Sequence, residues 1–319
     1  MKRDFLLFIG FSVLVMLAPQ LFEGGYMMNV LVFVGINTML AIALNLLLGY
    51  AGQISLGHAG FFGLGAYLSG IMTTTFSLNP WLAMPVAAIL VGFLAFLIGF
   101  PVLKLKGHYL AMATLGLGII FFITFNETYE WTGGPSGLSG IPYLELGGIS
   151  FDSDVKNYYL IWAVTLAVML FSLNLANSRV GRALRAVHDS EVAAQVLGVN
   201  ARLLKVQIFA LSAIISSLAG SLYAHTMTFI SPTSFGFNFS VELLTMVVIG
   251  GLGSIYGSFL GAALLTLLPE ILRGAHDYDI IIYGGLLMVM VMYMPGGLVR
   301  GIPALFRKII GRKGGDGHA

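Results

Sequence analysis

Runs of apolar residues follow one another along nearly the whole chain, and most runs have the length of a membrane-crossing helix. A helix rises 1.5 Å per residue, so about 20 apolar residues span a hydrocarbon core of about 30 Å. Lipid requires every backbone N–H and C=O to be satisfied within the segment, which favours helices, and these runs are too long for barrel strands. The pattern predicts ten spans, near residues 5–22, 27–48, 61–78, 81–103, 109–125, 158–176, 206–228, 241–250, 254–272 and 280–294.

The composition agrees with an all-α, polytopic transmembrane helical bundle of about ten (eight to ten) spans. Hydrophobic residues make up 58% of the 319 positions and charged residues only 9%, where a soluble domain carries about 25% charged residues. Ten crossings consume about 200 residues, which leaves no room for a separate catalytic domain. We therefore expect residues 1–319 to form a single transmembrane domain, with the first apolar run kept as an uncleaved span.

Basic residues are distributed unevenly between the two sides that alternate crossing creates. One side receives fourteen of the sixteen Lys and Arg residues, and the other receives Lys156 and Arg273. Because cytoplasmic loops are enriched in Lys and Arg, this distribution predicts that both termini are cytoplasmic. It also makes 126–157 an external loop and 177–205 a cytoplasmic loop. The run at 241–250 covers only about 15 Å as a helix and is a candidate half-helix.

Two glycine-rich stretches interrupt the regular pattern of spans. Residues 49–65 contain six glycines and no charge, and residues 250–257 contain four more glycines. We interpret them as discontinuous segments, because irregular backbone at membrane depth is tolerated only where it faces protein or a wet cavity. The alternative is that these glycines only let helices approach closely.

No enzyme signature accompanies this pattern. The dipeptide Gly-Lys, which a phosphate-binding loop requires, occurs nowhere in the chain, and no His-Glu-x-x-His zinc motif is present. Cysteine is absent and the formal charge is only +2, so neither a thiolate metal site nor nucleic-acid binding is indicated. We expect no cofactor bound by this chain. Ionisable residues near the middle of a span would indicate ion-driven transport, but the nearest candidate, Glu242, is predicted at the external start of its span.

The cytoplasmic loop predicts two short helices. Ser178 is placed to cap the first, which presents Arg182 and Arg185 on one side, a basic face that suits the phosphates of membrane lipid. Asp189 or Ser190 is placed to cap the second.

The second helix has Glu191 in its first turn, the small residues Ala193 and Ala194 in its body, and Gly198 as a left-handed stop. Isolated helices of two turns are marginal in water. We therefore expect this helix to lie against a partner; the alternative is a solvated connector.

Five separated motifs, in order, resemble the permease subunits of branched-chain amino-acid ABC importers, of the LivM type. They are LNLLLGYAGQISLGHAG at 44–60, GHYLAMATL at 107–115, TGGPSGL at 132–138, SRVGRALRAV at 178–187 and VIGGLGSIYG at 248–257. The resemblance implies a transmembrane permease in the bacterial cytoplasmic membrane that imports Leu, Ile and Val or a broader set of hydrophobic amino acids.

The same resemblance implies partners and a coupling helix. The partners are a second related permease subunit, two ATP-binding subunits that hydrolyse ATP, and an extracytoplasmic amino-acid-binding protein. Ala193, Ala194 and Gly198 match the family pattern Glu-Ala-Ala-x-x-x-Gly, but position 192 is Val and the acid is Glu191, one residue earlier. The acidic external loop is the expected docking surface for the binding protein.

Polar and glycine residues of the two discontinuous stretches are our candidates for the translocation path, along which a zwitterion passes without meeting a buried charge. They are Tyr50, Gln53, Ser55 and His58 in the first stretch, and Gly250, Gly251, Gly253 and Ser254 in the second. Two alternatives remain: an importer of urea or short-chain amides, whose permeases are similar, and a self-sufficient channel or secondary transporter.

Overall fold

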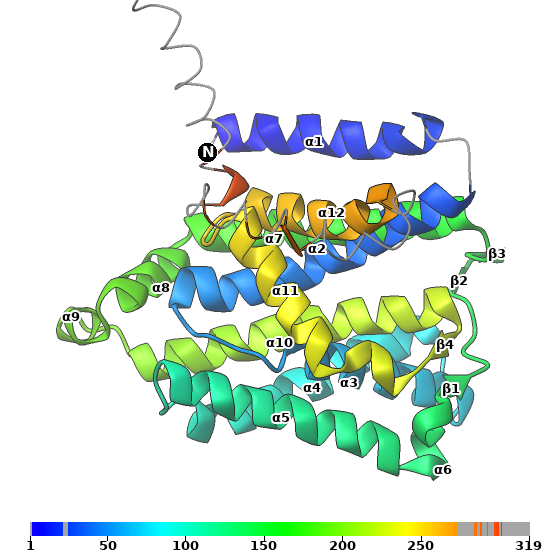
Figure 1. Cartoon of the computed structure of the whole chain (residues 1–319), viewed down its shortest axis with the longest axis horizontal. Helices are drawn as coiled ribbons and strands as arrows, with labels where there is room; N and C mark the ends of the chain where they lie inside the picture. Colours follow the sequence, from blue (N-terminus) through cyan, green and yellow to red (C-terminus); the bar gives the residue numbers. More distant parts are fainter. Residues whose placement is uncertain are drawn as a thin grey trace, which may run out of the picture.

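The chain folds as a bundle in which most helices run roughly side by side along its long axis, while α11 (Phe237–Gly250) crosses them obliquely (Figure 1). This computed structural model describes residues 2–21, 25–272, 284–285, 288, 292, 297–299 and 301. The predicted tenth span, 280–294, lies outside the described residues except for four positions. The predicted cytoplasmic C-terminus lies outside them too.

Each of the nine predicted spans within the described residues corresponds to one helix. The helices are α1 (Lys2–Leu21), α2 (Gly25–Ala51), α3 (His58–Thr74), α4 (Pro80–Val102), α5 (His108–Glu127), α7 (Asp154–Asn177), α10 (Ala201–Met227), α11 (Phe237–Gly250) and α12 (Ile255–Leu272). Six of them, α2, α4, α5, α7, α10 and α12, are long and apolar enough to cross a membrane.

The two predicted loops lie at opposite ends of the bundle, as the alternation of spans requires (Figure 1). The loop 177–205 forms α8 (Arg179–Asp189) and α9 (Glu191–Val196). At the other end, the external loop forms α6 (Tyr129–Thr132), a 3₁₀ turn (Gly134–Ser136) and short strands. Each strand has two residues. Strand β2 (Glu145–Leu146) pairs with β3 (Ile149–Ser150) within the loop, and β1 (Leu138–Ser139) pairs with β4 (Phe229–Ile230), which follows α10; both pairs are antiparallel.

Helix α2 forms the centre of the core and is buried along nearly all of its length from Val30 onward. It packs against α7, α10 and α12. On the α7 side, the Trp162 indole donates to the Leu31 carbonyl at 3.1 Å and the Thr165 hydroxyl donates to the Gly35 carbonyl at 3.2 Å. Such side chain to backbone bonds hold neighbouring helices together where the hydrophobic effect does not.

Helices α3 and α10 touch through their backbones. A Cβ atom at Gly65 would lie 2.2 Å from the Ser217 carbonyl oxygen, and one at Gly220 would lie 2.0 Å from the Phe62 carbonyl oxygen. The Ser221 hydroxyl donates to the Gly65 carbonyl at 3.1 Å. Small residues are therefore required on both helices for this contact.

A side chain at position 220 should force α3 and α10 apart. We expect Gly220→Val to lower the free energy of unfolding by about 3 kcal/mol, the upper part of the usual range for overpacking, because the opposing atom is backbone and cannot move aside. Thermal unfolding of the purified protein measures this loss. Gly116→Ala in α5, where a Cβ meets nothing within 4 Å, is the matched control, and equal losses for both variants would contradict the close contact.

Candidate functional site

The chain between α2 and α3 re-enters the bundle as a non-helical segment, residues 52–57 (Figure 1). Helix α3 begins where this segment ends, and its first residue, His58, places Nε2 3.1 Å from Oγ of Ser212. Ser212 is the twelfth of the 27 residues of α10, so α3 starts at the mid-depth of the bundle. Farther along, Ser69 Oγ lies 2.9 Å from Nε2 of His225, which shows that α3 continues beside α10 toward the C-terminal end of α10.

Side chains satisfy part of this non-helical backbone. The N–H of Leu56 donates to the Thr114 hydroxyl of α5 at 3.0 Å, and the N–H of Gly57 donates to the Ser55 hydroxyl at 3.5 Å. Gly57 also approaches α5 closely, since a Cβ there would lie 2.5 Å from the Thr114 carbonyl oxygen. The segment is thus held against α5 at the depth where lipid could not solvate it.

A second break occurs before α11, at the same depth. After β4, the chain forms a 3₁₀ turn (Pro232–Phe235) and α11 then begins at Phe237. The N–H of Ala59 in α3 donates to the Ser240 hydroxyl of α11 at 3.2 Å. The two helices therefore start side by side, and α11 runs inward while α3 runs outward.

This arrangement corrects the sequence-based position of Glu242. The predicted half-helix is present, but it begins at mid-depth rather than at the external surface, because residues 229–236 descend without forming a continuous helix. Glu242 is the sixth residue of α11 and lies about 8 Å farther along that helix than Phe237.

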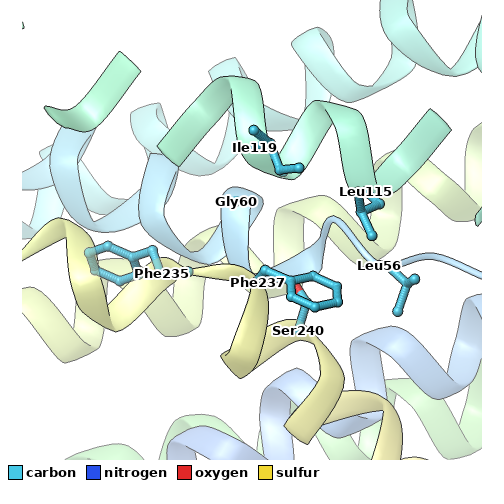
Figure 2. Close-up of a pocket in the computed structure, with 9 residues that line it drawn as sticks. Leu56, Gly60, Leu115, Ile119, Phe235, Phe237 and Ser240 are labelled. Carbon is cyan, nitrogen blue, oxygen red and sulfur yellow. The ribbon is translucent and has the colours of Figure 1, made fainter. Parts of the chain in front are cut away.

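A small pocket lies at the junction of α3, α5 and α11. Its volume is about 10 Å³, enough for about one water molecule, so it does not admit an amino acid in this conformation. Figure 2 shows Leu115 and Ile119 of α5 facing the start of α11 across Gly60 of α3. The residues that line it are Leu56, Gly60, Leu115, Gly118, Ile119, Phe235, Gly236, Phe237 and Ser240.

The polar residues predicted in the first glycine-rich stretch lie in different places. Ser55 and His58 are buried at the junction, where the two ring nitrogens of His58 contact the hydroxyls of Ser55 (2.9 Å) and Ser212 (3.1 Å). Gln53 lines an open cavity of about 260 Å³ at the end of the bundle that holds α8 and α9. Tyr50 lies in the last turn of α2, and the guanidinium carbon of Arg185 lies 5.9 Å from the centroid of its ring.

The second glycine-rich stretch forms the turn between α11 and α12. Gly251 and Gly253 have φ of +126° and +72°, values that residues with a Cβ rarely adopt. A Cβ at Gly250 would lie 2.0 Å from the Gly257 carbonyl oxygen, and one at Gly49 would lie 2.3 Å from the Gly253 nitrogen. The structure thus brings the two stretches together at Gly49, near the end of α2, and not at His58.

Asn45 organises this turn, and the sequence analysis did not single it out. Its amide is fully buried and donates to the Ser254 carbonyl (2.9 Å) and the Ser258 hydroxyl (2.8 Å), while its oxygen accepts the Gly253 N–H at 2.9 Å. A buried amide needs several partners. The signal that could have found Asn45 is its polarity within the apolar run 39–48 of α2.

The capping pattern predicted for the cytoplasmic loop is confirmed. The Ser178 hydroxyl accepts the N–H groups of Val180 and Gly181, and the Ser190 hydroxyl accepts the N–H of Ala193 at 3.3 Å. Gly198 has a φ of +83°, the left-handed conformation predicted for the end of the second helix.

Glu191 joins α9 to two other parts of the molecule. Its carboxylate lies 2.8 Å from Nζ of Lys205 in α10 and 3.2 Å from Nζ of Lys106 in the loop between α4 and α5. Burial by itself raises the pKa of Glu191, but the hydrogen bonds and charges of the two lysines outweigh it and hold the pKa below its ordinary value. Lys205 is only 3% exposed, so this pair fixes α9 to the first turns of α10.

Helix α9 has an inner and an outer face. Ala194 is 1% exposed and packs with Val187 and Ala201 in a small separate core. The outer face is apolar instead of charged: Val192, Val196 and Leu197 are 70%, 83% and 80% exposed. Ala193 is also exposed. A cluster of exposed large apolar side chains is typical of surfaces that contact a protein partner or a membrane.

The two arginines predicted to face lipid phosphates have acceptors within the chain. Arg182 donates to the Asn177 carbonyl at 3.2 Å and Arg185 donates to the Ala176 carbonyl at 3.1 Å. Both carbonyls belong to the last turn of α7, where cations are favourable. These contacts fix α8 against the end of α7.

Comparison with known proteins identifies the relatives of this chain. Residues 26–294 match the family described as "Branched-chain amino acid transport system / permease component". The chain is 34% identical over 259 residues to the high-affinity branched-chain amino acid transport system permease protein LivM of Escherichia coli K12, with 74% of this chain and 61% of that protein covered.

Two other relatives are more distant. The permease protein LivH of the E. coli K12 branched-chain system is 31% identical over 144 residues, which cover 44% of this chain and 46% of LivH. The autoinducer 2 import system permease protein LsrC of E. coli K12 DH10B is 29% identical over 224 residues, or 66% and 61% of the two chains. The match thus spans about three-fifths of the length of LivM. No solved structure matches the chain.

Gly198 offers a test of the geometry of the cytoplasmic loop. We expect Gly198→Val to strain the loop by about 1–2 kcal/mol, because its backbone is left-handed. Nothing lies within 4 Å of an added Cβ, so this strain comes from the backbone conformation and not from a steric clash. Trypsin cleavage after exposed Arg202 should then become about 5 to 30 times faster. Gly198→Asn, which tolerates the left-handed region, should be cleaved almost as slowly as the wild type. Similar rates for Val and Gly would contradict this conformation.

Proposed function

The chain belongs to the family of permease components of branched-chain amino acid transport systems, and we propose that it is the LivM-type permease subunit of an ATP-driven importer. Its substrates are Leu, Ile and Val or a broader set of hydrophobic amino acids, and its location is the bacterial cytoplasmic membrane. Two ATP-binding subunits supply the energy, because the sequence contains no phosphate-binding loop.

The outer face of α9 carries this proposal. Val192, Val196 and Leu197 form an exposed apolar surface at the end of the bundle where the basic loops lie. The caps, the Ala194 contact and the Glu191–Lys205 pair hold this surface in a fixed orientation. A rigid apolar surface of this kind suits docking to an ATP-binding subunit, so that motion of the partner reaches α10.

The junction of α3 and α11 supports the transport part of the proposal. Two helices that start at mid-depth leave non-helical backbone in the membrane interior, which is tolerated only where it faces protein or a water-filled cavity. A second, related permease subunit would cover this side of the bundle. Its presence agrees with the similarity to both LivM and LivH.

The external loop supports docking of the amino-acid-binding protein. Glu127, Glu130, Asp152 and Asp154 lie in it or at its ends, and the strand pairs and the Asp152–Lys156 pair (3.0 Å) give it a defined shape. Hydrogen bonds from Lys156 and Ser150 lower the pKa of Asp152 below its ordinary value, so this carboxylate stays ionised at neutral pH.

Uptake by the complete complex tests the substrate class. Membrane vesicles that contain this chain and its copurified partners should import labelled leucine in an ATP-dependent way and should not import labelled urea. Uptake of urea alone would replace the amino-acid proposal with an amide importer. Flux through the purified chain without ATP or partners would replace it with a channel or secondary transporter.

A charge on the outer face of α9 tests the coupling surface. We expect Val196→Glu to reduce ATP-dependent leucine uptake at least tenfold, because a carboxylate would be desolvated at the contact with the ATP-binding subunit, while the protein still inserts in the membrane. Val180→Glu, at an exposed position of α8, is the matched control and should keep normal uptake. Normal uptake by the Val196 variant would mean that α9 is only a connector.

A further inference from the structure

One face of α11 carries three polar side chains in a row. Asn238, Glu242 and Thr245 follow one another at spacings of four and three residues, which places them on the same side of the helix. Ser240 lies on the other side and contacts α3. The remaining residues of α11 are almost all apolar, so the row is a distinct polar stripe.

The rest of the described chain covers this stripe only in part. Val241 and Val248, which flank it, are 39% and 37% exposed, and Asn238 is exposed as well. Glu242 is half-buried, and its carboxylate makes no hydrogen bond or ion pair with any residue that the structure describes. The Thr245 hydroxyl bonds to the Val241 carbonyl of its own helix at 2.8 Å.

The depth of Glu242 makes its missing partner significant. The contact between Ala59 and Ser240 places the start of α11 at the middle of the bundle, so Glu242 lies within the membrane interior. Ionisable side chains at this depth are costly, face a bundle interior or a water-filled cavity, and mark the pathways of substrates.

The surface of α4 shows what a lipid-facing helix of this chain looks like. Its exposed large side chains are all apolar: Leu82, Val86, Ile89, Leu90, Phe93 and Leu97. The exposed face of α11 is different, since a carboxylate and an amide interrupt it. Lipid therefore suits α4 and does not suit this face of α11.

We propose that the polar stripe of α11 forms one wall of the substrate path and that Glu242 binds the ammonium group of the amino acid in transit. The inference rests on the proposed function. An ammonium group carries three donors and a positive charge, and a partly desolvated carboxylate forms strong charge-assisted hydrogen bonds with it. Asn238, one turn nearer the junction, adds a second polar contact, and Phe237 continues the wall as an apolar surface.

This role also gives Glu242 a part in selectivity. Leucine, isoleucine and valine carry the ammonium group, whereas urea and short amides carry no cation to offset the carboxylate. A path with Glu242 in its wall therefore favours amino acids. It differs from the sequence-based expectation that the zwitterion meets no buried charge.

Transport by charge-neutral variants tests the role of Glu242. In proteoliposomes that hold the complete complex and saturating binding protein, Glu242→Gln should lower leucine uptake at least tenfold while ATP hydrolysis continues, and Glu242→Asp should recover part of it. Glu270→Gln, the same change at the external end of α12, is the control and should transport normally. Normal uptake by Glu242→Gln overturns the inference while the proposed function stands; a wild-type complex that imports no leucine refutes the proposed function itself.

Thiol labelling tests the exposure of the stripe without depending on any substrate. The chain contains no cysteine, so single cysteines at Asn238 and Val241 are the only targets in this subunit for a membrane-impermeant cationic thiol reagent. We expect both to react in the assembled complex, and leucine with its binding protein to slow the reaction. Ile89→Cys, 67% exposed on α4, should not react. Absence of reaction at both α11 positions would show that no aqueous path reaches the stripe and would overturn the inference.

Discussion

The need to satisfy backbone hydrogen bonds inside a membrane governs the architecture of this chain. Continuous helices meet that need by themselves, but α3 and α11 both begin at mid-depth, and the chain before each of them is not helical. Polar side chains lie at both breaks: Thr114 and Ser55 accept N–H groups of the re-entrant segment, and Ser240 accepts the N–H of Ala59. Because such bonds replace water, their positions determine where the helices can break.

The sequence predicted the helices well, because hydrophobicity over about 20 residues is set by the thickness of the membrane. All nine spans within the described residues correspond to helices, with ends that differ by a few residues. The depth at which a helix starts was not predictable in the same way. A glycine-rich interruption has the same composition whether it forms a surface turn or a segment that re-enters the bundle, and so Glu242 was placed too near the external surface.

Some features of the candidate site could be predicted from the sequence, and others could not. The caps at Ser178 and Ser190 and the left-handed Gly198 follow from local chemistry, which acts over three or four residues. The inward direction of Ala194 depends instead on packing against Val187 and Ala201, and a short sequence pattern does not contain that information. The role of Asn45, which binds a turn more than 200 residues away in sequence, is equally a property of the folded chain.

The direct backbone contact of α3 with α10 has a mechanical consequence. Carbonyl groups lie directly against Gly65 and Gly220, so no side chain separates the two helices at these points, and we expect them to move as one body. The loop between α9 and α10, residues 197–200, would act on one end of this pair of helices. The start of α3 lies about halfway along α10. A tilt of α10 would therefore displace the junction with α11, and the six residues before α3 would supply the hinge.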